Sequence, residues 1–183
     1  MSILFINACV RENSRTLVLA KKVLSDMAGE IAEIDLNNEI IPPLNRQLLA
    51  KREELVRMGD KNDPMLRHAK QFAEADEIVI AAPFWDLSFP AILKAYMEQI
   101  TVSGITFDYI NGIPCGLCKA KRLTYVTTSG GPIFVDFGYE YIKTLAKTFY
   151  GINETRAFRA MNLDVNMIPA EELLTKAEIS VIE

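Results

Sequence analysis

Short apolar runs alternate with segments of helical spacing along this chain, and this alternation restricts the fold more than any other feature. The five strand-sized runs lie at residues 3–6, 30–36, 78–82, 122–128 and 155–161. Between them, apolar residues recur every three or four positions, as in amphipathic helices. Strands that alternate with helices predict a parallel sheet with helices on both faces, joined by right-handed crossovers.

The helical segments have recognisable boundaries. They are expected after residue 14, at about 45–58 and 64–75, after Pro90, around 142–149, and after Pro169. Ser88 is expected to cap the helix that has Pro90 in its first turn. Gly151 suits the position just after a helix.

Length and composition favour one ordinary globular domain spanning residues 1–183. A length of 183 residues corresponds to about one domain. The formal net charge of −4 argues against a nucleic-acid partner, because phosphate backbones attract basic surfaces. Three cysteines are too few for a disulfide framework, which indicates a reducing, cytoplasmic compartment. We expect no signal peptide and no membrane span, because no apolar run approaches about 18 residues.

Three loops with unusual composition follow predicted strands, at residues 7–16, 83–90 and 127–132. In an open α/β sheet, ligands bind beyond the carboxyl ends of the strands, where the strand order reverses. We therefore expect these loops to converge on one site.

The first loop has the chemistry of a phosphate site, although it contains neither G-x-G-x-x-G nor a P-loop motif. It offers the hydroxyls of Ser14 and Thr16, arginines that include Arg11, and the N-terminus of the next helix. Hydroxyls, guanidinium groups and free helix N–H groups together bind phosphate. The alternative is that Ser14 only caps the helix and the arginines are solvated.

The composition of the other two loops is typical of a site that binds a flat aromatic ring. Phe84 and Trp85 are large aromatics in a turn after a buried strand, and Gly130-Gly131 lets backbone approach a ligand closely. The alternatives are core or subunit packing for the aromatics and a plain turn for the glycines. A phosphate at one end and a planar ring at the other is the shape of FMN.

The sequence also resembles the flavodoxin-like FMN-dependent NAD(P)H:quinone and azo-dye reductases. Ala82–Lys94 is similar to the family's A-P-[aromatic-rich]-N-F-x-I-P-x-x-L-K segment, and Gly104–Tyr109 is similar to its G-x-T-F-x-Y. Gly116-Leu117, followed by a basic stretch, a strand and Thr128–Gly131, completes the pattern. The similarity covers about residues 1 to 160.

The resemblance implies a flavodoxin-like, doubly wound, three-layer α/β/α fold with five parallel strands in the order 2-1-3-4-5. It implies FMN as cofactor, with FAD as the less favoured alternative, and NADH or NADPH as co-substrate. The flavin N5 would carry hydride in ping-pong turnover to a quinone, azo or nitro-aromatic acceptor. No catalytic side chain is then required. Family members are usually homodimers, and the apolar helix after Pro90 also suggests a C2 dimer.

The resemblance assigns cofactor-binding roles residue by residue. The phosphate would be held by Arg11, Ser14 and Thr16. The ring edge would lie along Pro83, Phe84, Trp85, Asp86 and Leu87, and the pyrimidine side would meet Thr128, Ser129, Gly130 and Gly131. Asp86 replaces the family's usual asparagine, and its carboxylate would lower the flavin potential. Glu12 must point away from the phosphate.

Two alternatives to a reductase remain open. Cys9 to Arg15 forms a C-x5-R sequence, which resembles the loop of low-molecular-weight protein tyrosine phosphatases. Cys9 would then be the nucleophile and Arg15 the phosphate clamp. Val10, Arg11 and Glu12 depart from that family's small polar residues. A non-enzymatic flavin electron carrier is the other alternative, although the flavodoxin T-x-T-G-x-T loop is absent.

The remaining cysteines form a C-x2-C pair, Cys115 and Cys118. A zinc or iron–sulfur site needs about four ligands, and only Cys9 and His68 remain, so we expect no metal. A redox dithiol stays open, beside ordinary buried or loop cysteines. His68 is expected on the surface of a helix.

Overall fold

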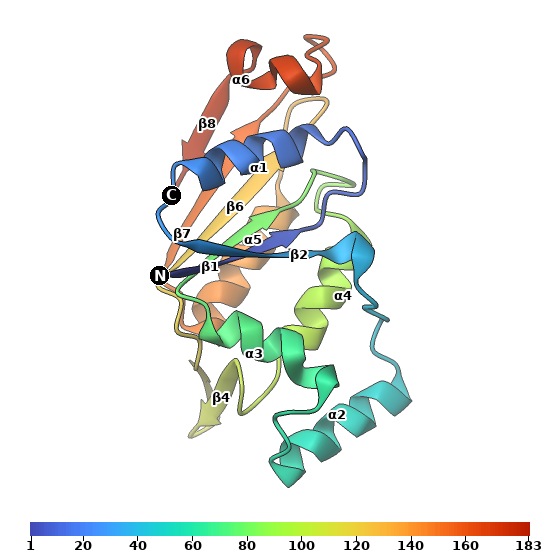
Figure 1. The fold of residues 1–183 in the computed structure, drawn as a ribbon, viewed down its shortest axis with the longest axis vertical. Helices are drawn as coiled ribbons and strands as arrows, with labels where there is room; N and C mark the ends of the chain where they lie inside the picture. The colour runs from blue at the N-terminus through green and yellow to red at the C-terminus, as the bar shows by residue number, and fades with distance from the viewer.

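A six-stranded sheet forms the centre of the computed structural model, which describes residues 1–183 (Figure 1). The strand order is β2-β1-β3-β6-β7-β8, and only β8 runs antiparallel to its neighbour. The strands are β1 (Ser2–Asn7), β2 (Glu30–Asp35), β3 (Glu77–Ala81), β6 (Arg122–Thr128), β7 (Glu154–Ala160) and β8 (Ile179–Ile182). The five parallel strands therefore confirm the predicted order 2-1-3-4-5.

The prediction of a five-stranded sheet was wrong by one strand, because β8 adds an antiparallel edge next to β7. A separate hairpin, β4 (Phe107–Ile110) and β5 (Ile113–Gly116), was also not predicted as strands. Asn111 and Gly112 join its strands with φ values of 53° and 79°. Asn-Gly with positive φ at both positions is the usual hairpin turn, so the sequence did contain this signal.

Helices cover both faces of the sheet, which gives the predicted three layers (Figure 1). The α-helices are α1 (Arg15–Ser25), α2 (Arg46–Met58), α3 (Arg67–Glu74), α4 (Ala91–Ile100), α5 (Phe137–Leu145) and α6 (Leu173–Lys176). Shorter turns are η1 (Leu36–Asn38), η2 (Pro64–Leu66), the π-helical η3 (Ala146–Tyr150) and η4 (Ala170–Glu172). The smaller core cluster lies under α1 and α6, and the larger one under α3, α4 and α5. No helix combines the length and apolar character needed to cross a membrane.

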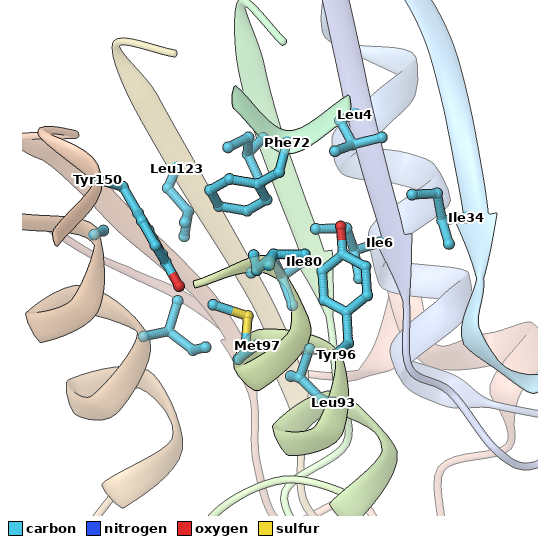
Figure 2. Packing of buried hydrophobic residues seen from close by; sticks show 14 of the residues in the cluster. Leu4, Ile6, Ile34, Phe72, Ile80, Leu93, Tyr96, Met97, Leu123 and Tyr150 are labelled. Carbon is cyan, nitrogen blue, oxygen red and sulfur yellow. The ribbon is translucent and has the colours of Figure 1, made fainter. Parts of the chain in front are cut away.

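The apolar side of α4 belongs to the larger core cluster and is not a free surface. Leu93, Tyr96, Met97 and Ile100 are fully buried. Figure 2 shows Tyr96 and Met97 directed from α4 toward the side chains of the sheet. The apolar stripe after Pro90 is thus explained within one chain, and it gives no support to a dimer.

Two local expectations near α4 were wrong. Pro90 is itself the N-cap of α4, while Ser88 exchanges backbone hydrogen bonds with Trp85 in the preceding turn. His68 is buried, with its ring 5.6 Å from that of Tyr96. Burial, with the Arg67 charge adding to it, lowers the pKa of His68, so the imidazole is held neutral.

Candidate functional site

A cleft of about 200 Å³ lies beyond the carboxyl ends of β1, β3 and β6, and all three predicted loops contribute to it. This is where the strand order reverses, since β2 lies on one side of β1 and β3 on the other. Nine of the twelve predicted residues line the cleft: Arg11, Ser14, Thr16, Pro83, Phe84, Trp85, Thr128, Ser129 and Gly130. Asp86 and Gly131 directly follow lining residues in the chain, but Asp86, Leu87 and Gly131 are not part of the lining. Asn13, Arg15 and Asp164 line it in addition.

The first loop presents a helix N-terminus to the cleft. Ser14 is the N-cap of α1, and its Oγ accepts a hydrogen bond from the N–H of Leu17 at 3.2 Å. The N–H groups of Ser14, Arg15 and Thr16 donate to no acceptor within the chain. Free N–H groups at a helix start attract anions. Ser14 therefore caps the helix, as the alternative interpretation of the first loop predicted. The free N–H groups beside it can still bind an anion.

Two arginines at this end of the cleft differ in their surroundings. Arg11 is exposed and forms no hydrogen bond or ion pair with the rest of the chain. Arg15 is bound to Asp164 across the cleft. Glu12 is exposed and does not line the cleft.

A buried hydroxyl pair joins the first and third loops. The Oγ1 atoms of Thr16 and Thr128 are 2.7 Å apart, and both residues are buried. A hydrogen bond between neutral groups contributes about 1 kcal/mol. This contact fixes the start of α1 relative to the end of β6.

The second loop forms a tight turn that is held by its own backbone. Trp85 and Ser88 exchange N–H to O hydrogen bonds of 3.1 and 2.7 Å. Asp86 and Leu87 between them have φ values of 50° and 65°. Both central residues of a type I′ turn are left-handed, a conformation that costs a non-glycine residue roughly 1 kcal/mol or more. Leu87 is about half exposed in this turn, two residues after the lining residue Trp85.

The third loop offers backbone donors. The N–H groups of Gly130 and Gly131 donate no hydrogen bond within the chain. The Ser129 hydroxyl donates to the Gly131 carbonyl at 2.5 Å, which fixes the loop. A Cβ on Gly131 would meet nothing within 4 Å, whereas one on Gly130 would lie 2.0 Å from Oδ2 of Asp164.

Asp164 is the lining residue that the sequence reasoning missed. It follows β7, the last parallel strand, so the rule that ligands bind beyond strand ends applied to this segment as well. The segment lacks the glycines, aromatics and hydroxyls that drew attention to the other loops. Its position after a strand was the only available signal.

The structure argues against the phosphatase alternative. Cys9 is 5% exposed and does not line the cleft, and its thiol points toward the Ala81 carbonyl at 3.7 Å. Burial raises the pKa of the Cys9 thiol to about 11. A nucleophilic cysteine needs an accessible thiolate, which these surroundings suppress. Arg15, the expected clamp, is already paired with a carboxylate.

The surroundings of the C-x2-C pair explain it as part of the packed structure. Cys118 is directed to the Thr106 carbonyl at 3.4 Å, and burial raises the pKa of its thiol to about 12. Cys115 and Cys118 are both free thiols. Gly116 between them packs directly against the backbone of Tyr150 and Gly151, which fixes the segment for structural reasons.

Comparisons with known proteins agree with this fold. A model of the Flavodoxin_2 family, described as having a flavodoxin-like fold, matches residues 1–181. An FMN-dependent NADH:quinone oxidoreductase from Clostridium perfringens is 36% identical over 180 residues, which cover 93% of this chain and 90% of the relative.

Two solved structures from Bacillus anthracis share the fold. An azoreductase superimposes with a TM-score of 0.79 at 22% identity, covering 96% of this chain and 93% of that one. An FMN-dependent NADH-azoreductase in complex with FMN gives a TM-score of 0.76 at 23% identity, covering 95% and 92%. The family match and the identity of the relative lead to one conclusion: this chain belongs to the Flavodoxin_2 family.

Proposed function

We propose that this protein is an FMN-dependent oxidoreductase that uses NADH to reduce a quinone or azo acceptor. The proposal rests on the cleft at the point where the strand order reverses. This cleft has free helix N–H groups and Arg11 at one end. The aromatic turn and Gly130, whose N–H is free, line the rest of the cleft, and the free N–H of Gly131 follows Gly130 in the chain. The relatives named as FMN-dependent NADH:quinone oxidoreductases support the cofactor, the donor and the acceptor class.

The cleft would enclose part of FMN, and the rest would lie at its rim. Its volume of about 200 Å³ is below the roughly 300–1,000 Å³ of pockets that enclose a drug-sized ligand. The polar end suits the phosphate and the ribityl chain. The open space over Gly131, where a Cβ would meet no atom, suits the edge of a flat ring.

The chemistry that FMN supplies when bound is the transfer of two electrons between a nicotinamide and an aromatic acceptor. This chain's residues bind and orient. The α1 N-terminus and Arg11 would hold the phosphate, and Trp85 and Phe84 would limit the position of the ring. The free N–H groups of Gly130 and Gly131 would stabilise negative charge that develops on the ring during reduction, because fixed donors stabilise such charge. No acidic side chain is required, because solvent protonates the product.

A visible absorption spectrum of the purified protein, with FMN added if the protein is colourless, tests this function. We expect flavin bands that bleach when NADH is added without oxygen and return when a quinone is added. A protein that neither carries nor binds FMN would reject the proposal. Binding without bleaching by NADH or NADPH would instead identify a flavin carrier that is not this enzyme.

Gly131→Ala is expected to weaken FMN binding about tenfold without harming the fold. The new Cβ has open space in the free protein, and Gly to Ala at an unstrained position stabilises by about 0.4–1 kcal/mol. With FMN bound, the same methyl group would occupy the space proposed for the ring edge. Fluorescence titration with FMN and thermal unfolding measure the two effects. An unchanged FMN affinity would mean that the ring lies elsewhere.

We infer that two copies pair through the rim of this cleft. Phe134 and Phe137 are 90% and 61% exposed, and Val135 and Leu87 are about half exposed. The Leu87 carbonyl accepts a hydrogen bond from the Phe137 N–H at 2.9 Å, so residues 134–137 lie beside the turn that follows Trp85. Clustered exposed apolar groups mark an interaction surface. A second copy would cover them and complete the open side of the cleft.

Phe134→Glu is expected to convert a dimer into a monomer, because a charge would be buried in the interface. Sedimentation velocity at micromolar concentration measures the change. Met58→Glu is the matched control, since Met58 is 69% exposed on α2, outside the rim. A monomeric natural protein, or an equal effect of both variants, would contradict pairing through the rim.

A further inference from the structure

An ion pair lies at the polar end of the cleft. It engages Arg15, one of the two arginines that line the cleft. A nitrogen of the Arg15 guanidinium lies 2.5 Å from Oδ1 of Asp164. The other terminal nitrogen donates to the Ile168 carbonyl at 3.2 Å. Arg15 is the first residue of α1, so its side chain starts beside the free N–H groups that form the anion site.

Asp164 is held in place by the glycine loop. Its N–H donates to the Gly130 carbonyl at 3.0 Å, and Oδ2 lies against Gly130, where a side chain would otherwise stand. Yet the Asp164 side chain is 69% exposed, and Oδ2 has no hydrogen-bond partner. A carboxylate thus projects into the lining of a cleft whose other charged groups, Arg11 and Arg15, are basic.

We propose that Asp164 is a positioning residue that masks Arg15 and competes with the FMN phosphate for it, which lowers the affinity for FMN. This inference rests on the proposed function. Arg11 has no partner and is available to a phosphate at once, whereas Arg15 must first leave a carboxylate. Both partners are anionic oxygen groups, and a guanidinium binds either by the same charge-assisted hydrogen bonds.

The size of the effect follows from the exposure of the pair. A partly exposed ion pair contributes up to about 1 kcal/mol, which corresponds to roughly fivefold in an equilibrium constant. Release of Arg15 also allows an added charge-assisted bond to the phosphate. We therefore expect Asp164→Asn to bind FMN about five- to tenfold more tightly. Riboflavin, which has the same ring and no phosphate, is expected to bind equally to both proteins.

The experiment compares FMN and riboflavin dissociation constants by flavin fluorescence in four proteins: the natural chain, Asp164→Asn, Arg15→Gln and the double variant. Arg15→Gln is expected to change FMN binding little in the natural chain and to abolish the gain in Asp164→Asn. Glu12→Gln is the matched control, because it removes an exposed carboxylate near Arg15 in the chain that does not line the cleft.

Each outcome has one meaning. A gain for FMN alone that depends on Arg15 supports the proposal. An equal gain for riboflavin, no gain, or the same gain from Glu12→Gln overturns it. Failure of the natural chain to bind either flavin rejects the proposed function itself. Thermal unfolding checks that each variant folds, and Asp164→Ser replaces Asp164→Asn if it does not.

Discussion

Asp136→Ala is expected to lower the free energy of unfolding by about 3–5 kcal/mol. Asp136 and Arg159 form an ion pair at 2.6 Å, and their side chains are only 6% and 14% exposed. Loss of the carboxylate leaves a buried guanidinium without its counter-charge. Asp136 also caps α5, since Oδ1 accepts the N–H groups of Gly138 and Tyr139 at 2.8 and 2.9 Å. Urea denaturation followed by circular dichroism measures the change.

The matched control for Asp136→Ala is the loss of an aspartate from an exposed ion pair. Asp26→Ala removes the exposed partner of Lys22 and is expected to change stability by less than about 0.5 kcal/mol. Arg159→Met in the Asp136→Ala background is expected to recover part of the loss, because no buried charge is then left unpaired. A loss below about 1 kcal/mol for Asp136→Ala would contradict the importance of this pair.

The Cys9 thiol is expected to react with iodoacetamide at pH 8 at least about 100-fold more slowly in the folded protein than after unfolding. The pKa of about 11 is two units above the ordinary value of 9.0, and each unit reduces the thiolate fraction tenfold. Burial of the sulfur slows the reaction further. Peptide mass spectrometry separates Cys9 from the half-buried Cys115, which is the internal control.

The same pKa has a consequence for stability. Between about pH 9 and 11 the unfolded Cys9 thiol ionises while the folded one does not. The free energy of unfolding therefore falls as pH rises, by about 1.4 kcal/mol for each pH unit in that window. Cys9→Ser is expected to reduce this slope. Rapid alkylation of Cys9 in the folded protein would contradict its burial and revive the phosphatase alternative.

The parallel sheet could be predicted because its strands carry a strong signal. Runs such as Ile78–Ala81 are buried on both faces, so they are apolar without interruption. β8 has only Ile179, Val181 and Ile182 on an exposed edge, and so short a run resembles a loop. His68 was predicted to be exposed because it is polar, but its burial depends on α4, whose Tyr96 packs against it from a distant part of the chain.

The site could be predicted from the positions of loops but not from the contacts between them. Thr16 and Thr128 were both candidates, yet nothing in the sequence indicates that their hydroxyls meet across 112 residues. The Arg15–Asp164 pair joins residues even further apart. The left-handed turn at Asp86 and Leu87 was also not predictable, because Leu87 stands at the position where such turns prefer Gly.

Carboxylates lie in or beside the two outer strands of the sheet. β2 contains Glu30, Glu33 and Asp35, and β8 is flanked by Glu178 and Glu183. Unpaired strand edges are templates for aggregation, and charges on them prevent it. Because both ends carry the same sign, two copies that meet edge to edge repel each other. The molecule is thus protected from open-ended growth into fibres, and association through another surface can stop at a closed pair.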